Sequence, residues 1–246
     1  MSRDRRRQRG SSGGRGSGTL GGSRGETVRV KTAAKRRPSS TRWLERQLND
    51  PYVAEAKRLG YRSRAAFKLL QLDERFHVLT KGKRVVDLGA APGGWSQVAV
   101  ERVRSQEPGG GRVVAIDLQE MEPVSGAVVL HMDGTTVEAS ARAKQELGGG
   151  ADVVLSDMAP AATGHHQTDH IRIMGLAESA YETAKELLEP GGAFIVKVWQ
   201  GGAQKELLDA LKREFDTVRH VKPPASRSDS AELYLVALGF RGRRGN

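Results

Sequence analysis

The strongest constraint on the fold of this chain is the alternation of short apolar runs with longer segments of helical periodicity. The runs read RVVDLG from residue 84, RVVAIDL from 112, AVVLHMD from 127, ADVVLSD from 151 and AFIVKVW from 193. Glycine, proline or polar residues mark the turn after each run. This alternation predicts an α/β fold with a mostly parallel, doubly wound sheet of Rossmann-like type.

Two further apolar runs close the chain, TVRHVKP from residue 217 and ELYLVALGF from residue 232. They leave no room for a crossover helix between them, so we expect two antiparallel neighbours. Before the sheet, the stretch SRAAFKLLQLDERFH has Ala66, Leu69 and Phe76 at helical spacing. This spacing predicts a helix with Ser63 as its N-cap.

Length and composition restrict the class of protein. A chain of 246 residues is long enough for one α/β domain with a full core. Because the sequence has no cysteine, disulfides, thiolate zinc sites and iron–sulfur clusters are excluded. No apolar stretch approaches the roughly 18 residues of a membrane span, and no apolar signal core begins the chain. We therefore expect a cytoplasmic protein with no membrane partner.

Positive charge is concentrated on the N-terminal side of the chain. Of the formal net charge of +11, residues 1–40 carry +10, residues 42–84 carry +6 and residues 85–246 carry −5. A basic tail followed by a basic helical lead-in, over residues 41–80, is typical of a protein with an RNA partner. A solvated charged surface is the alternative explanation.

Residues 1–40 are rich in arginine, glycine and serine and almost free of large apolar side chains. Such a segment cannot bury enough surface to offset its ordering entropy, so we expect a disordered basic tail. An organelle transit peptide has a similar composition, but the eight glycines disfavour the amphipathic helix it would need. Residues 41–246 are expected to form a single domain.

Candidate ligand residues stand where the predicted strands end, because doubly wound sheets bind ligands outside the carboxyl ends of their strands. The first of these turns reads VVDLGAAPGGWSQ. Its glycines let the backbone approach a ligand closely, whereas the G-x-G-x-x-G spacing of dinucleotide sites and the Walker A lysine are missing. Asp87 begins this turn and favours a ligand that carries positive charge. A purely structural tight turn is the alternative.

Polar residues also end the next strands. Asp117 is placed to accept hydrogen bonds from a ribose diol, and Asp133 could accept one from an adenine amino group. Each could instead cap the turn or helix that follows it. Asp157 lies in SDMAP at the end of the fourth strand. Lys197 ends the apolar strand FIVKVWQG, where a charge costs free energy unless it is paired or functional.

Five segments closely resemble those of the FtsJ-type ribose 2′-O-methyltransferases and follow in the same order: SRAAFKL, VVDLGAAPGGWSQ, SDMAP, FIVKVWQG and SAELYLVALG. The resemblance extends from about Trp43 to Gly239. It implies a seven-stranded methyltransferase sheet whose last strand runs antiparallel. It also implies S-adenosylmethionine as the cofactor, bound by residues that match the family's contacts: Gly93, Trp95, Asp117, Asp133 and Asp157.

The same resemblance implies an active site formed by Lys68, Asp157, Lys197 and Glu232. A ribose 2′-hydroxyl is a weak nucleophile at neutral pH, so its proton must leave as the oxygen attacks the methyl carbon. We expect Lys197 to accept the proton, with Lys68 as the neighbouring cation that favours the neutral amine. Asp157 would hold Lys197, and Glu232 would steer Lys68 or the ribose. The histidines lack the spacing of metal ligands, so no metal is expected.

The resemblance is strongest to the bacterial enzymes that modify large-subunit ribosomal RNA. It implies methylation of a uridine in the A-loop of 23S rRNA, within the large ribosomal subunit and in support of ribosome assembly. A relative that methylates tRNA or another rRNA nucleotide is the alternative. A nicotinamide dehydrogenase is disfavoured by the glycine spacing, and a catalytically silent RNA-binding protein by the four acid/base residues.

The sequence contains no appended RNA-recognition module. Recognition would then depend on a few basic residues, and we expect Arg62, Arg64 and Lys68 to contact the RNA. Such a protein needs its target displayed by a preformed particle, on which we expect it to act as a monomer.

Overall fold

The computed structural model describes residues 41, 44–45, 47–160, 163–201 and 204–242. It contains two units, Met1–Asn49 and Asp50–Asn246. In the first unit the described residues are helical as far as Leu48, and the backbone N–H of Asn49 donates to the carbonyl oxygen of Glu45 at 3.1 Å. The predicted basic tail, residues 1–40, lies outside the described residues.

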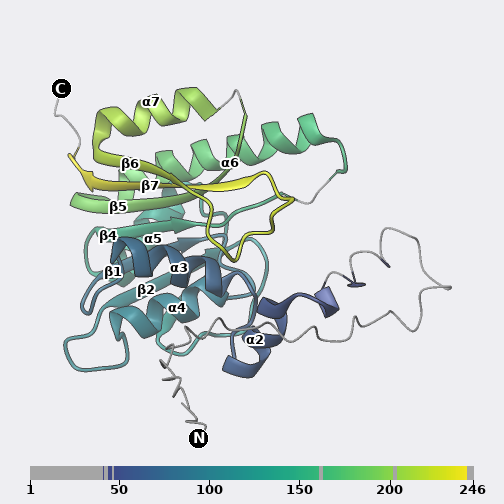
Figure 1. The fold of residues 1–246 in the computed structure, drawn as a ribbon. Coiled ribbons are helices and arrows are strands. Elements are labelled where there is room, and N and C mark those ends of the chain that lie inside the picture. Colours follow the sequence, from purple (N-terminus) through teal and green to yellow (C-terminus); the bar gives the residue numbers. More distant parts are fainter. Residues whose placement is uncertain (1–40, 42–43, 46, 161–162, 202–203, 243–246) are drawn as a thin grey trace, which may run out of the picture. The chain divides into compact units, whose positions relative to one another are not determined.

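The described part of the second unit alternates helices with strands along the chain (Figure 1). In order, the elements are α2 (Pro51–Leu59), α3 (Ala66–Phe76), β1 (Arg84–Leu88), α4 (Gly94–Val103), β2 (Arg112–Asp117), β3 (Ala127–His131), α5 (Val137–Leu147), β4 (Ala151–Ser156), α6 (His166–Leu187), β5 (Leu188–Trp199), α7 (Gln204–Glu214), β6 (Phe215–Val221) and β7 (Glu232–Phe240). Every apolar run named above contains a strand.

The strands form one seven-stranded sheet in the order β3-β2-β1-β4-β5-β7-β6. Strands β3, β2, β1, β4 and β5 pair in parallel. Strand β7 lies between β5 and β6 and runs antiparallel to both. The predicted mostly parallel sheet and its antiparallel closing pair are therefore confirmed.

One connection differs from the predicted alternation, because residues 118–126 join β2 to β3 without a helix although the two strands are parallel. The carbonyl oxygens of Glu122 and Pro123 in this loop each accept a hydrogen bond from the guanidinium group of Arg62, at 2.6 Å. A side chain thus satisfies backbone groups that a helix would satisfy internally.

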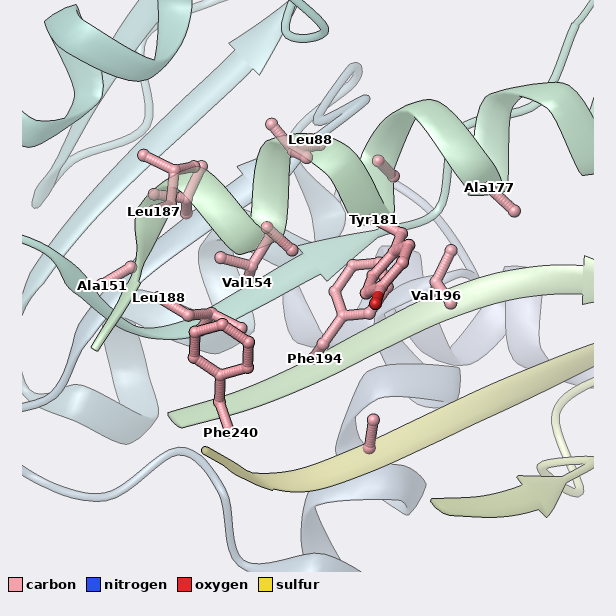
Figure 2. Packing of buried hydrophobic residues seen from close by; sticks show 14 of the residues in the cluster. Leu88, Ala151, Val154, Ala177, Tyr181, Leu187, Leu188, Phe194, Val196 and Phe240 are labelled. Atoms are coloured by element: carbon pink, nitrogen blue, oxygen red, sulfur yellow. The ribbon is translucent and has the colours of Figure 1, made fainter. Parts of the chain in front are cut away.

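Apolar side chains are buried on both faces of the sheet, as expected for parallel strands covered by helices. Helices α5, α6 and α7 cover one face, where Val154, Tyr181, Phe194 and Phe240 pack together (Figure 2). Helices α3 and α4 contribute to the cluster on the other face, which also holds the side chains of Leu69, Trp95 and Tyr234. The helices on both faces fix the strand ends that form the site.

A local signal explains how α2 begins, whereas the start of α3 differs from the prediction. The side chain of Asp50 caps α2 by accepting from the backbone N–H of Tyr52 at 3.0 Å. The prediction of Ser63 as the N-cap of α3 is wrong, because Ala65 occupies that position. Ser63 instead packs against the turn after β1, where a Cβ added at Gly94 would lie 2.4 Å from Ser63 Oγ.

None of the described helices is long and apolar enough to cross a membrane.

Candidate active site

A cavity of about 650 Å³ lies at the carboxyl ends of the parallel strands. Five of the predicted site residues line it: Trp95, Asp117, Asp133, Asp157 and Lys197. The turn after β1 and the segment 157–160 after β4 form further parts of its wall. The strand ends that the sequence singled out therefore meet in one place.

The glycine turn after β1 packs too closely for side chains. A Cβ added at Gly89, where φ is +75°, would lie 2.4 Å from Met158 Cγ, so the turn must approach the segment after β4 as bare backbone. Gly93 has a φ of +109° and precedes the first residue of α4. It shapes the turn but does not line the cavity, whereas its neighbours Pro92 and Gly94 do.

Two carboxylates in the cavity wall also brace their own loops. Asp117 accepts from the backbone N–H of Ala91 at 2.8 Å and from that of Gln119 at 2.7 Å. Asp133 accepts from the hydroxyl of Thr135 at 2.7 Å and from its backbone N–H at 2.9 Å, and these bonds lower the pKa of Asp133. The helix that follows is capped by Thr136 rather than by Asp133. Both residues therefore brace a turn and line the cavity, and Asp133 does not cap the helix after it.

Asp87 lies near the end of β1, immediately before the glycine turn, and it is fully buried. Its Oδ2 accepts from the hydroxyl of Ser96 at 2.6 Å, while Oδ1 has no partner among the described residues. Burial raises the pKa of Asp87 to about 7, with smaller contributions from the nearby charges of Asp157 and Asp117. The carboxyl group is therefore within reach of its neutral form near physiological pH.

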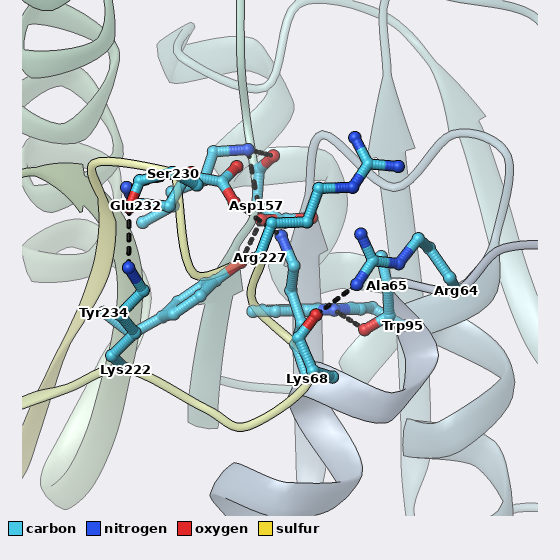
Figure 3. A network of polar contacts seen from close by, with 12 residues as sticks. Arg64, Ala65, Lys68, Trp95, Asp157, Lys222, Arg227, Ser230, Glu232 and Tyr234 are labelled. Atoms are coloured by element: carbon cyan, nitrogen blue, oxygen red, sulfur yellow. Dashed lines mark hydrogen bonds and ion pairs between the residues drawn. The ribbon is translucent and has the colours of Figure 1, made fainter. Parts of the chain in front are cut away.

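The four predicted catalytic residues form two ion pairs. Figure 3 labels three of them, Lys68, Asp157 and Glu232. Lys197 Nζ lies 2.5 Å from the carbonyl oxygen of Asp157 and 3.1 Å from its Oδ1. Lys68 Nζ lies 3.1 Å from Glu232 Oε2. Lys197 and Asp157 line the cavity, whereas Lys68 and Glu232 lie beyond its wall.

The environment of Asp157 keeps its carboxyl group charged. Burial alone would raise the pKa of Asp157, but the charges of Lys197 and Lys68 and the hydrogen bonds from Tyr234 and Lys197 lower it below the ordinary value. The carboxylate is a half-buried anion compensated by cations on two sides, one from β5 and one from α3.

Sequence reasoning missed Tyr234 at this site. Its hydroxyl donates to Asp157 Oδ1 at 2.6 Å, and its side chain is fully buried. The alternating pattern of β7 marks a tyrosine at this position as a core residue, and nothing in that pattern indicates what the hydroxyl contacts. The only signal in the sequence is that Tyr234 stands two residues after Glu232, which places the two side chains on the same face of the strand.

Arg62 and Arg64, expected to contact RNA, are engaged within the protein. Arg62 Nη1 also donates to the carbonyl oxygen of Pro92 at 3.1 Å, so this residue ties the glycine turn to the β2–β3 loop. Arg64 forms an ion pair with Asp50 at 3.0 Å and donates to the carbonyl oxygen of Ala225.

In the described part of the chain, no group of three or more His, Cys, Asp or Glu residues is arranged to hold a metal ion.

Comparisons with known proteins agree with this geometry. The family model for FtsJ-like methyltransferases matches residues 61–240. Ribosomal RNA large subunit methyltransferase E of Paramagnetospirillum magneticum is 64% identical over 92% of this chain and 93% of its own length. The protein of the same name from Rhodospirillum rubrum is 59% identical over 91% of this chain and 85% of its own.

A solved structure shares the fold. A Plasmodium falciparum protein assigned as a ribosomal RNA methyltransferase superposes with a TM-score of 0.66, at 30% identity, over 74% of this chain and 100% of that one. Matching motifs, a matching fold and relatives of nearly full length lead to one conclusion: the chain belongs to the FtsJ-like methyltransferase family.

Proposed function

We propose that this protein transfers a methyl group from S-adenosylmethionine to the 2′-hydroxyl of a uridine in the A-loop of 23S rRNA, within the large ribosomal subunit. The observation that carries the proposal is the pairing of Lys197 with Asp157 at the wall of the cavity. The names of the relatives at 64% and 59% identity support the large-subunit substrate.

The cavity fits the cofactor that the family implies. S-adenosylmethionine supplies a methyl group on a positively charged sulfur. Asp117 would accept hydrogen bonds from its ribose hydroxyls and Asp133 one from its adenine amino group. Leu118, which is 67% exposed, would contact the adenine ring. The charged Asp157 suits a cationic group, and the glycine turn would approach the cofactor as backbone.

Lys197 is proposed as the base. A neutral amine has two N–H groups and one lone pair, and Asp157 offers two acceptors to Nζ, at 2.5 and 3.1 Å. With both N–H groups donated to Asp157, the lone pair is directed away from it, toward the cavity that Lys197 lines. A 2′-hydroxyl placed there passes its proton to Nζ as its oxygen accepts the methyl group.

Lys68 and Glu232 are proposed to position the nucleophile. Lys68 is buried and held by Glu232 at 3.1 Å. Its positive charge disfavours a second protonated lysine nearby and so favours the neutral form that a base needs. Lys68 would also donate to the 2′-oxygen, where negative charge develops during the transfer.

The target is proposed to be displayed by a preformed particle. Arg62 and Arg64 are committed to backbone carbonyls and Asp50, so they offer little to free RNA. We propose the large subunit, rather than free rRNA or tRNA, as the substrate, the cytoplasm as the location and a monomer as the acting form. A 2′-O-methyltransferase for tRNA or another rRNA nucleotide is the second candidate.

A single assay separates these substrates. Large subunits, free 23S rRNA and bulk tRNA, each lacking the modification, are incubated with labelled cofactor, and the labelled nucleotide is then mapped. We expect label on one A-loop uridine of the large subunit, and none from the Lys197→Ala control. Label confined to tRNA, or to another rRNA position, would contradict the proposed substrate. Label on a base would contradict the proposed chemistry.

A further inference from the structure

Tyr234 is buried at the centre of the two ion pairs and has no role in the mechanism above. It lies on β7 directly opposite Lys197 on β5. In Figure 3 its ring extends from β7 toward Asp157, with its hydroxyl at the carboxylate. Burial raises the pKa of Tyr234 well above its ordinary value, so the hydroxyl keeps its proton and acts as a donor.

The hydroxyl of Tyr234 and the ammonium group of Lys197 share one acceptor. Asp157 Oδ1 lies 2.6 Å from the Tyr234 oxygen and 3.1 Å from Lys197 Nζ. A second donor on the same oxygen fixes the plane of the carboxylate, and it withdraws part of the negative charge that would otherwise attract Lys197.

The ring of Tyr234 is held on both sides. It packs against Trp95, with ring centroids 5.6 Å apart at an interplanar angle of 34°. Lys68 Nζ lies 5.7 Å from the centroid of the ring, within the range of a cation–π interaction. Trp95 is fixed in turn by a 2.8 Å hydrogen bond from its indole N–H to the carbonyl oxygen of Ala65. The hydroxyl is therefore presented to Asp157 from a rigid support.

We propose that Tyr234 is a positioning residue for methyl transfer, whose hydroxyl orients Asp157 and limits the attraction of that carboxylate for the proton on Lys197. The inference rests on the proposed function of Lys197 as the base. Without the hydroxyl, Asp157 Oδ1 would interact with the ammonium form of Lys197 alone. The neutral amine, which is the reactive form, would then be less populated at a given pH.

Several charged groups act on Tyr234 and Asp157, and each element packed around them contributes. They are Lys197 on β5, Lys68 on α3, Arg64 in the turn before α3, Glu232 on β7 and Asp87 on β1. All of them remain in a Tyr234→Phe variant, which removes one oxygen atom and keeps the ring. A change in pH dependence in that variant is therefore caused by the missing hydroxyl.

The test compares Tyr234→Phe with Tyr181→Phe. Tyr181 is also buried, and it packs against Phe194 on the other face of the sheet. For Tyr234→Phe we expect kcat to fall about tenfold at neutral pH, the loss expected for one hydrogen bond to a charged group. We expect the rising limb of its pH–rate profile to move to higher pH, so that alkaline buffer restores part of the rate. Cofactor affinity by calorimetry should equal that of the wild type.

Tyr181→Phe should leave the pH–rate profile unchanged, and thermal melts of both variants report any loss of folded protein. A lower rate without a shift in the profile would make Tyr234 a structural residue and overturn the proposal, as would an unchanged rate. Rates are compared on whichever RNA the wild-type enzyme methylates. A wrong assignment of the target RNA would therefore appear in the wild type, and a wrong role for Tyr234 only in the ratio of variant to wild type.

Discussion

Lys197 Nζ contacts both the main chain and the side chain of Asp157, at 2.5 Å to the carbonyl oxygen and 3.1 Å to Oδ1. Asp157 directly follows β4 and Lys197 lies near the end of β5, its parallel neighbour, so the distance between them is set by the sheet itself. A lysine held in this way has little conformational freedom left to lose, which suits the base proposed above.

Replacing Lys197 with alanine should abolish methyl transfer, because it removes the amine that takes the 2′-hydroxyl proton in the proposed mechanism. Cofactor affinity measured by calorimetry should stay close to that of the wild type. Lys197→Arg should be equally inactive, since guanidinium does not deprotonate in the working pH range. Loss of cofactor affinity together with activity would indicate a structural role for Lys197 instead.

Asp117→Ala should raise the cofactor dissociation constant by one or two orders of magnitude, as expected for losing about 1.5–3 kcal/mol of charge-assisted hydrogen bonding. Saturating cofactor should restore much of the rate. Asp117→Asn keeps an acceptor for the backbone N–H of Ala91 and should have a smaller effect. If turnover stays absent at saturation in both variants, Asp117 does more than bind cofactor.

Arg62→Lys should weaken cofactor binding while leaving the salt dependence of RNA binding unchanged. Lysine cannot reproduce the three carbonyl contacts, to Pro92, Glu122 and Pro123, that hold the glycine turn against the β2–β3 loop. Calorimetry measures the first effect, and filter binding over a series of salt concentrations measures the second. A shallower salt slope would instead identify Arg62 as a phosphate contact.

Asp87→Asn should stabilise the protein more at pH 8 than at pH 5. The pKa of Asp87 is raised to about 7, so its contribution to stability is full below its unfolded pKa and is lost as pH rises through the folded value. Asparagine removes this loss, so the gain in the free energy of unfolding should be about 2.5 kcal/mol larger at pH 8 than at pH 5. Denaturant unfolding of the variant and the wild type at both pH values measures this difference in the free energy of unfolding.

The opposite sign is expected at Asp152, which serves as the matched control. Its hydrogen bonds with Arg84 outweigh burial and lower the pKa of Asp152. Its contribution is therefore present above the unfolded pKa and is lost as pH falls. Asp152→Asn should destabilise the protein at pH 8. If both substitutions destabilise it there, the assignment for Asp87 is wrong.

Deleting residues 1–40 should leave cofactor binding and maximal turnover intact, because every proposed catalytic residue lies beyond them. Their net charge of +10 should contribute to RNA binding through counterion release. Affinity for ribosomal particles should fall, and the plot of log affinity against log salt should become shallower. A slope that stays the same would show that the segment does not contact RNA.

The sequence predicted the sheet well because strand signals here are local. Each apolar run is bounded by turn residues, and burial on both faces leaves little choice of element. The link over residues 118–126 could not be predicted, since its shape depends on Arg62, some sixty positions earlier in the chain. Ser63 was misassigned for the same reason, because its contact with Gly94 is set by tertiary packing.

Motifs identified the site residues more readily than their contacts. The strand ends were visible as polar residues after apolar runs, and the resemblance supplied Lys68 and Glu232, which helical or strand periodicity alone would not single out. That Lys68 meets Glu232 depends on where α3 packs against the sheet. Tyr234 was missed because its pattern is that of a core residue, and only the fold shows where its hydroxyl lies.

The reversed direction of β7 decides which end of this strand is close to the chemistry. Glu232 begins β7 opposite Trp199, the last residue of β5, and Phe240 ends β7 opposite Phe215, the first residue of β6. The chain therefore leaves the sheet at the edge remote from the cavity. A fluorescent label attached close to Phe240 would lie away from the cavity, so this end of β7 is the suitable position for a probe that must not disturb the proposed chemistry.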